Sequence, residues 1–278
     1  MLTRIITSIV ATAVLIPVLI FSDTVVFPIA LAIVAVVSMF EILTCIGMKK
    51  RISLVLPMYV FAAAFPFLMR YMSAKQTAMI AFLAATLYVI YLFAHVVWSH
   101  GAIPFSDGAA FFTLAIYILT AITCIVYVRD FSQGGKYLYL LIFMGAWITD
   151  IFAYFTGYFI GKHKLIEDVS PKKTVEGSIG GIVFCALSFA VFGWVVNGFF
   201  GQNANVLFLT VSGVIISVIS QIGDLIMSVI KRHYKIKDFG KIFPGHGGML
   251  DRFDSILAVA LGLAAICVFS TLTNIPIM

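Results

Sequence analysis

Three aspartates near the C-terminal end of the chain have a spacing suited to phosphate chemistry. Asp224 lies on an apolar stretch of helical length, and Asp251 and Asp254 stand three residues apart at the start of the next one, on one helical face. Carboxylate oxygens are the ligands that Mg²⁺ prefers, and bound Mg²⁺ bridges substrate phosphates. These residues predict metal-assisted phosphoryl or nucleotidyl transfer.

Cations flank the aspartates in the sequence. Lys231 and Arg232 follow the first aspartate within two helical turns, and Arg252 lies between the other two. Such cations offset the charge that develops on a transferred phosphorus and its leaving group. A simpler alternative is that Asp251 and Asp254 only stabilise a helix N-terminus while pairing with the arginine between them.

A second cluster of polar residues precedes another apolar stretch. The segment 170–178 reads S-P-K-K-T-V-E-G-S, so that two lysines and two hydroxyl groups stand before a predicted helix start. This arrangement suits a polyphosphate, because a helix N-terminus adds partial positive charge. The alternative is a lysine pair that only anchors the chain at the membrane surface. The candidate substrate-binding residues here are Ser170, Lys172, Lys173, Thr174 and Glu176.

An aspartate also occurs near the middle of an apolar stretch. Asp150 is followed at helical spacing by Tyr154, Gly157, Tyr158 and Gly161. An ionisable group in hydrocarbon is unfavourable unless it is paired or lines a cavity. Asp150 is therefore a candidate substrate-binding residue, whereas the tyrosines and glycines fit a packing stripe equally well.

A glycine-rich loop connects the two aspartate-bearing stretches. It reads F-P-G-H-G-G-M over residues 243–249, and its glycines let the backbone approach a ligand closely. Its amides are suited to phosphate oxygens. His246, Gly247 and Gly248 are candidate substrate-binding residues, although a lone loop histidine is more often a structural hydrogen-bonding group.

The elements that carry these residues belong in a membrane. Hydrophobic residues make up 62% of the 278 residues and charged residues 11%, and the mean hydropathy of +1.11 excludes an ordinary soluble protein. We expect an all-α, polytopic integral membrane protein with an uncleaved first helix and a third span that is kinked or partly re-entrant at its two prolines. The nine predicted transmembrane helices cover 5–21, 25–46, 52–70, 76–97, 108–127, 137–161, 178–196, 206–230 and 254–273.

The distribution of positive charge predicts the orientation. Basic residues concentrate near the N-terminus and in the second, sixth and eighth connections, which therefore face the cytosol. The net charge of +6 is explained by anionic lipid headgroups and anionic substrates, so no nucleic-acid partner is expected. We expect residues 1–130 to form a scaffold on the dimer or lipid side and residues 131–278 to carry the catalytic site.

The stretch from Ser228 to Asp254 resembles a known family. It reads S-V-I-K-R-H-Y-K-I-K-D-F-G-K-I-F-P-G-H-G-G-M-L-D-R-F-D and is similar to the signature of the phosphatidate cytidylyltransferases, also called CDP-diacylglycerol synthases. The S-P-K-K-T-x-E-G segment and the Asp150 face also look like features of this family. The first 130 residues carry little that is diagnostic.

The resemblance implies an activity and its requirements. The phosphate of phosphatidic acid would attack the α-phosphorus of CTP, giving CDP-diacylglycerol and pyrophosphate, with Mg²⁺ and a candidate second cation such as K⁺. It implies metal ligation by Asp224 and Asp251, with Asp254 close by as a further ligand or an orienting residue. It also implies substrate contacts that extend to Lys237 and Asp238. A homodimer in the bacterial cytoplasmic (inner) membrane, with its active site facing the cytosol, is expected.

Two other functions compete with this interpretation. A CTP-dependent lipid kinase of the polyprenol or phytol type needs similar residues, but it would not place cytidine in the lipid. An ion-coupled transporter would use Asp150 and Asp224 as an intramembrane relay and would leave the dense eighth connection unexplained. A CDP-alcohol phosphotransferase is disfavoured, because the D-G-x-x-A-R motif is absent from the sequence.

Overall fold

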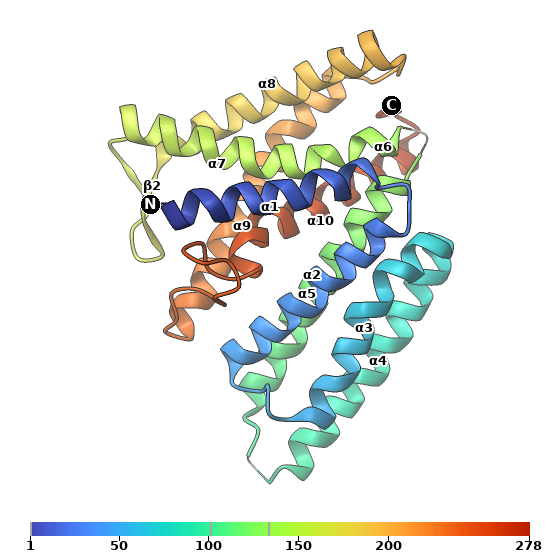
Figure 1. Cartoon of the computed structure of the whole chain (residues 1–278), viewed down its shortest axis with the longest axis vertical. Coiled ribbons are helices and arrows are strands. Elements are labelled where there is room, and N and C mark those ends of the chain that lie inside the picture. Colours follow the sequence, from blue (N-terminus) through green and yellow to red (C-terminus); the bar gives the residue numbers. More distant parts are fainter. Residues whose placement is uncertain (1, 101, 133) are drawn as a thin grey trace. The chain divides into compact units, whose positions relative to one another are not determined.

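The computed structural model describes residues 2–100, 102–132 and 134–278, and most of them are helical (Figure 1). The helices are α1 (Leu2–Ile20), α2 (Val26–Ile46), α3 (Ile52–Tyr71), α4 (Ala74–Trp98), α5 (Phe105–Asp130), α6 (Gly135–Leu138), α7 (Leu140–Ile160), α8 (Val175–Phe200), α9 (Val206–His233) and α10 (Leu250–Thr273). The strands are β1 (Lys164–Ile166) and β2 (Ser170–Thr174).

These helices make the chain a multi-pass membrane protein. Within the described residues, eight segments are long and apolar enough to cross a bilayer, and Gly135–Ile160 counts as one of them although it comprises α6 and α7. The apolar part Ile6–Ile20 of α1 is a shorter helix. The predicted all-α, polytopic fold is confirmed, and each of the nine predicted spans corresponds to a helical segment.

The described chain forms two compact units. The first contains the part up to Tyr127 together with Ile236–Arg252, and the second contains Val128–Lys235 and Phe253–Met278. The glycine-rich loop thus packs with the N-terminal helices, although in sequence it lies between α9 and α10. The division of roles expected between residues 1–130 and 131–278 stays a prediction.

In the first unit, α3 packs between α2 and α4. Tyr88 of α4 is buried against α3, where its hydroxyl donates a hydrogen bond to the Leu54 carbonyl at 2.8 Å and its ring meets Phe61 edge-on. Pro57 and Pro66 lie inside α3, which is a single α-helix from Ile52 to Tyr71, so a re-entrant break is not observed in this span.

In the second unit, α7, α8 and α9 pack pairwise against one another. Glycines permit the close approach of the helices. A Cβ atom on Gly180 of α8 would lie 2.6 Å from Thr156 Cγ2 of α7, and one on Gly213 of α9 would lie 2.9 Å from the Ala186 Cα of α8. Side chains at either position would force the helices apart.

A short antiparallel hairpin, which the sequence did not lead us to expect, connects α7 to α8. Lys164 pairs with Thr174 and Ile166 with Ser170. The hairpin ends at the helix start, because the Thr174 hydroxyl accepts a hydrogen bond from the Gly177 amide at 3.1 Å and caps α8. This hairpin places the predicted polyphosphate-binding segment beside α7 and α8.

Candidate active site

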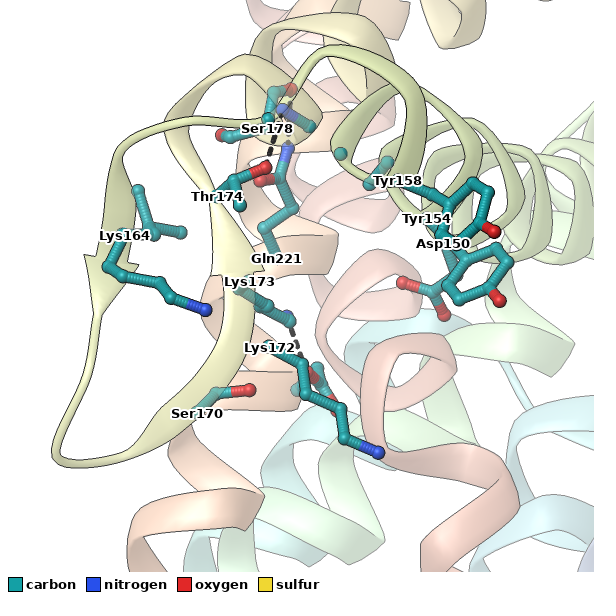
Figure 2. Close-up of a pocket in the computed structure, with 16 residues that line it drawn as sticks. Asp150, Tyr154, Tyr158, Lys164, Ser170, Lys172, Lys173, Thr174, Ser178 and Gln221 are labelled. Atoms are coloured by element: carbon teal, nitrogen blue, oxygen red, sulfur yellow. Dashed lines mark hydrogen bonds and ion pairs between the residues drawn. The ribbon is translucent and has the colours of Figure 1, made fainter.

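The second unit contains a pocket of about 630 Å³ between α7, the hairpin, α8 and α9 (Figure 2). Asp150, Tyr154 and Tyr158 of α7 lie on one side, and Lys172 and Ser170 of β2 lie on the other. The two tyrosine rings are stacked with centroids 6.2 Å apart. The remaining residues that line it are Ala153, Gly157, Gly161, Lys164, Leu165, Lys173, Thr174, Gly177, Ser178, Gln221 and Asp224.

An ion pair crosses this pocket. The Lys173 ammonium of β2 pairs with the Asp224 carboxylate of α9, and both side chains are about a quarter exposed. One turn before the aspartate, the Gln221 side-chain amide donates a hydrogen bond to the Ser178 carbonyl of α8 at 3.3 Å. The polar face of α9 is therefore directed toward the hairpin and the start of α8.

Two further aspartates of this unit belong to the same electrostatic group. Asp254 of α10 is half-buried and interacts electrostatically with Asp224, Lys231 and Asp150. The Ser255 hydroxyl donates a hydrogen bond to Asp150 Oδ2 at 3.1 Å. With Lys173, the group holds three carboxylates and two ammonium groups, so carboxylates are in excess.

Two predicted substrate-binding residues have clear structural roles. Glu176 Oε1 lies 2.6 Å from His163 Nδ1, and Glu176 Oε2 accepts a hydrogen bond from the Lys162 amide at 3.0 Å. This carboxylate therefore links the segment just before the hairpin to the first turn of α8. Thr174 caps the same helix, and a substrate contact by either residue stays a prediction.

The carboxylates provide hard oxygen donors, which suit Mg²⁺, and their excess negative charge favours a cation. Among the described residues, however, no group of three or more His, Cys, Asp or Glu side chains is arranged to hold a metal ion. The donor chemistry therefore fits a metal that takes one or two protein ligands and completes its shell with water and substrate phosphates.

Of the other predicted residues, Lys231 and the exposed Arg232 end α9 in the second unit, and the rest lie in the segment 236–252 of the first unit. Lys237, Asp238 and Arg252 are exposed there, whereas Asp251 is only 7% exposed. Asp251 Oδ2 accepts hydrogen bonds from the Phe239 amide at 2.8 Å and the Gly248 amide at 2.9 Å. One oxygen of this predicted metal ligand thus accepts two backbone hydrogen bonds from the segment that precedes α10.

The glycine-rich part of this loop is a tight turn that touches α1. Gly247 has φ +85° and its carbonyl accepts a hydrogen bond from the Phe243 amide at 2.9 Å, a conformation that favours glycine. The His246 Nε2 lies 3.3 Å from the Ser8 hydroxyl, and the Thr7 hydroxyl donates to the Pro244 carbonyl at 3.0 Å. His246 therefore has the structural contact that the simpler interpretation expected.

Comparison with known proteins identifies the family. A cytidylyltransferase family model matches residues 2–270. The chain belongs to the cytidylyltransferase family. The resemblance found in the sequence is confirmed, since the signature lies within the matched region.

The chain is similar to phosphatidate cytidylyltransferases from several bacteria. Phosphatidate cytidylyltransferases from Staphylococcus haemolyticus and Bacillus subtilis are 40% and 42% identical over 60% and 55% of this chain, and the matches span 62% and 56% of those proteins. These alignments cover less than two thirds of either relative. The phosphatidate cytidylyltransferase of Staphylococcus epidermidis is 32% identical over 93% of this chain and 96% of its own.

The sequence analysis missed one residue of this chain that has a candidate functional role. Glu41 lies in α2, is only 1% exposed, and accepts hydrogen bonds from the loop that carries the signature. The signal was present in the sequence, because a carboxylate inside an apolar span is itself a reason to suspect a function.

Proposed function

We propose that this membrane protein is a phosphatidate cytidylyltransferase that transfers CMP from CTP to phosphatidic acid. The observation that carries the proposal is the pocket of the second unit, which brings Lys172 and Lys173 together with two aspartates in a chain of this family. The names of the aligned relatives support the same activity.

In the proposed reaction, a phosphate oxygen of phosphatidic acid attacks the α-phosphorus of CTP. A new P–O bond forms, the bond between the α-phosphorus and the bridging oxygen of the β-phosphate breaks, and pyrophosphate leaves with the electron pair. The attacking phosphate is already ionised, so positioning and charge neutralisation matter more than a strong base. We therefore assign no general base.

We assign positioning and charge neutralisation to individual basic residues. Lys172 and Lys173 bind phosphate oxygens, and the pairing of Lys173 with Asp224 holds its ammonium in the pocket before the nucleotide arrives. Lys231 is electrostatically coupled to Asp254 and supplies positive charge to the same group. Arg232, Lys237 and Arg252 are the remaining candidate phosphate contacts.

Asp224 and Asp254 are the two residues we propose to hold Mg²⁺, and ligation by Asp251, the third predicted ligand, stays a prediction. A bound Mg²⁺ would neutralise charge on the phosphates, and K⁺ is the candidate second cation. The support is the excess of carboxylates described above. Asp251 can take this role only through a carboxylate that also holds two backbone amides.

The proposal includes a cellular location and an assembly. The basic loops support an active site on the cytosolic side of a bacterial inner membrane, since CTP is soluble and the lipid stays in the bilayer. The family resemblance supports a homodimer. Light scattering of the detergent-purified protein would contradict the dimer if it gave a monomer mass.

One assay tests the activity. Purified protein is incubated with cytidine-labelled CTP, phosphatidic acid and Mg²⁺, and both label in the lipid and pyrophosphate are measured. We expect both products in equal amounts. Label transfer only from the γ-phosphate of CTP would instead identify a lipid kinase, and near-normal turnover of both Asp224→Asn and Asp251→Asn would refute the metal assignment.

A further inference from the structure

Glu41 is a buried carboxylate within a helix of high mean hydropathy, 2.5 for α2. Burying such a group is unfavourable unless hydrogen bonds satisfy it. Glu41 is satisfied at two points: Oε1 accepts from the Met249 amide and Oε2 from the Leu250 amide, both at 2.8 Å. Two backbone donors more than 200 residues away in sequence thus determine where this side chain points.

The two amides lie at the N-terminal end of α10 (Leu250–Thr273). The first amides of a helix have no acceptor within the helix, and this end carries partial positive charge. Glu41 therefore acts as a cap supplied by another helix of the same unit. It fixes the point at which α10 begins, one residue before Asp251.

The loop leaves space for this carboxylate through two of its glycines. A Cβ atom on Gly248 would lie 2.6 Å from Glu41 Cδ, and one on Gly240 would lie 2.8 Å from the same atom. Any larger residue at these positions collides with Glu41. These glycines therefore accommodate a protein carboxylate, which accounts for them without a phosphate ligand.

Asp251, in the first turn of α10, completes the arrangement by accepting hydrogen bonds from the Phe239 and Gly248 amides. Glu41 and Asp251 thus hold adjacent amides of one segment: Gly248 bonds to Asp251, and the next two residues bond to Glu41. The path of residues 248–250 is determined by two carboxylates.

We propose that Glu41 is a positioning residue for the cytidylyl transfer: by capping α10 it sets the position of Asp251 and of the helix start that leads to Asp254. This inference rests on the proposed function for its kinetic consequence. Glu41 itself contacts neither substrate nor metal in the proposal. A purely structural glutamate would lower the amount of folded protein and leave the properties of the folded fraction unchanged.

The first test replaces Glu41 by glutamine. The glutamine oxygen can still accept one of the two backbone hydrogen bonds, whereas its NH2 group is a donor and would face the other backbone amide, which is also a donor. We expect kcat to fall by about tenfold to a hundredfold, because small misplacements of reacting groups have effects of this size. The Mg²⁺ concentration for half-maximal activity should rise, and the Met249 and Leu250 amides should exchange hydrogen faster. Ser38→Ala is the matched control, since Ser38 is also fully buried in α2.

A wild-type Mg²⁺ dependence and kcat in Glu41→Gln would overturn the inference. So would a loss confined to the yield of folded protein, because an inactive fraction does not change the Mg²⁺ concentration for half-maximal activity. If wild-type protein makes no CDP-diacylglycerol, the proposed function fails instead, and hydrogen exchange still tests the cap.

A second set of variants covers the case in which Glu41→Gln does not fold. Gly240→Ala pushes a methyl group against Glu41, and Glu41→Asp withdraws the carboxylate by one methylene. We expect the double variant to be several-fold more active than Gly240→Ala alone, because the shorter side chain relieves the overlap. Activity in the double variant at or below that of Gly240→Ala would contradict the proposed contact.

Discussion

Lys173 of β2 forms an ion pair with Asp224 of α9 inside the pocket of the second unit. The pair joins the hairpin to the helix that carries the first candidate metal ligand. A phosphate that enters the pocket meets an ammonium group that already has a carboxylate partner. The strength of this coupling is therefore part of the proposed mechanism, and it is measurable.

A double-mutant cycle tests the coupling. We expect Lys173→Met and Asp224→Asn each to lower kcat/KM by about 10²- to 10³-fold, the usual range for one preorganised electrostatic group. The double variant should lose less than the product of the two losses, because each single change already disrupts the pair. Lys75→Met, in the first turn of α4, is the control for loss of a lysine. Fully multiplicative losses would show that the pair has no role in turnover.

Thr174 is both a predicted substrate-binding residue and the observed cap of α8. Replacing it by alanine removes the cap and should destabilise the protein by about 1 kcal/mol, whereas Thr174→Ser keeps the hydroxyl and should cost less. Thermal melting in detergent measures both variants. If Thr174→Ala melts like the wild type but has a raised KM for CTP, the hydroxyl binds substrate and the cap is unimportant.

Much of the fold was predictable, because each span is a local property of about 20 apolar residues. The face of α7 that carries Asp150, Tyr154 and Tyr158 was also predictable, since helical spacing alone puts these residues on one side, and the structure places them in one pocket. The hairpin was not predicted. Its strands are three and five residues long and too short to show an alternating pattern.

The partners of the predicted residues could not be derived from spacing. Gly248 was expected to present its amide to phosphate. In the structure that amide donates a hydrogen bond to Asp251, and the Glu41 carboxylate occupies the space beside Gly248. Glu41 is 208 residues from Met249 in sequence. No local pattern contains such a pairing, so a buried carboxylate in an apolar span indicates a partner without identifying it.

The packing of α7 against α8 gives a stability prediction with an internal control. Gly180→Ala would place a methyl group 2.6 Å from Thr156 Cγ2, and overpacking of this kind costs about 1–3 kcal/mol. Gly198 lies on the same helix with open space around its Cα, so Gly198→Ala should be neutral or slightly stabilising through helix propensity. Melting temperatures compare the two variants directly. A Gly180→Ala protein as stable as Gly198→Ala would mean that α7 and α8 do not approach each other so closely.

The excess of carboxylates in the second unit gives a prediction about metal binding that does not depend on activity. Asp254 interacts electrostatically with Asp224, Asp150 and Lys231, and the group of three carboxylates and two ammonium groups keeps an excess negative charge that disfavours the folded state until a cation neutralises it. We therefore expect Asp254→Asn to melt at a higher temperature than the wild type when divalent metal has been removed.

Addition of Mg²⁺ should reverse this order. A ligand that binds only the folded state raises its stability according to concentration and affinity, so the wild type should gain more from Mg²⁺ than the variant. Asp107→Asn, which replaces an acidic residue in the first turn of α5, should behave like the wild type in both conditions. Equal Mg²⁺-induced shifts in the wild type and Asp254→Asn would exclude Asp254 as a ligand. Equal stability without metal would show that the repulsion is already screened, because removal of the carboxylate then relieves nothing.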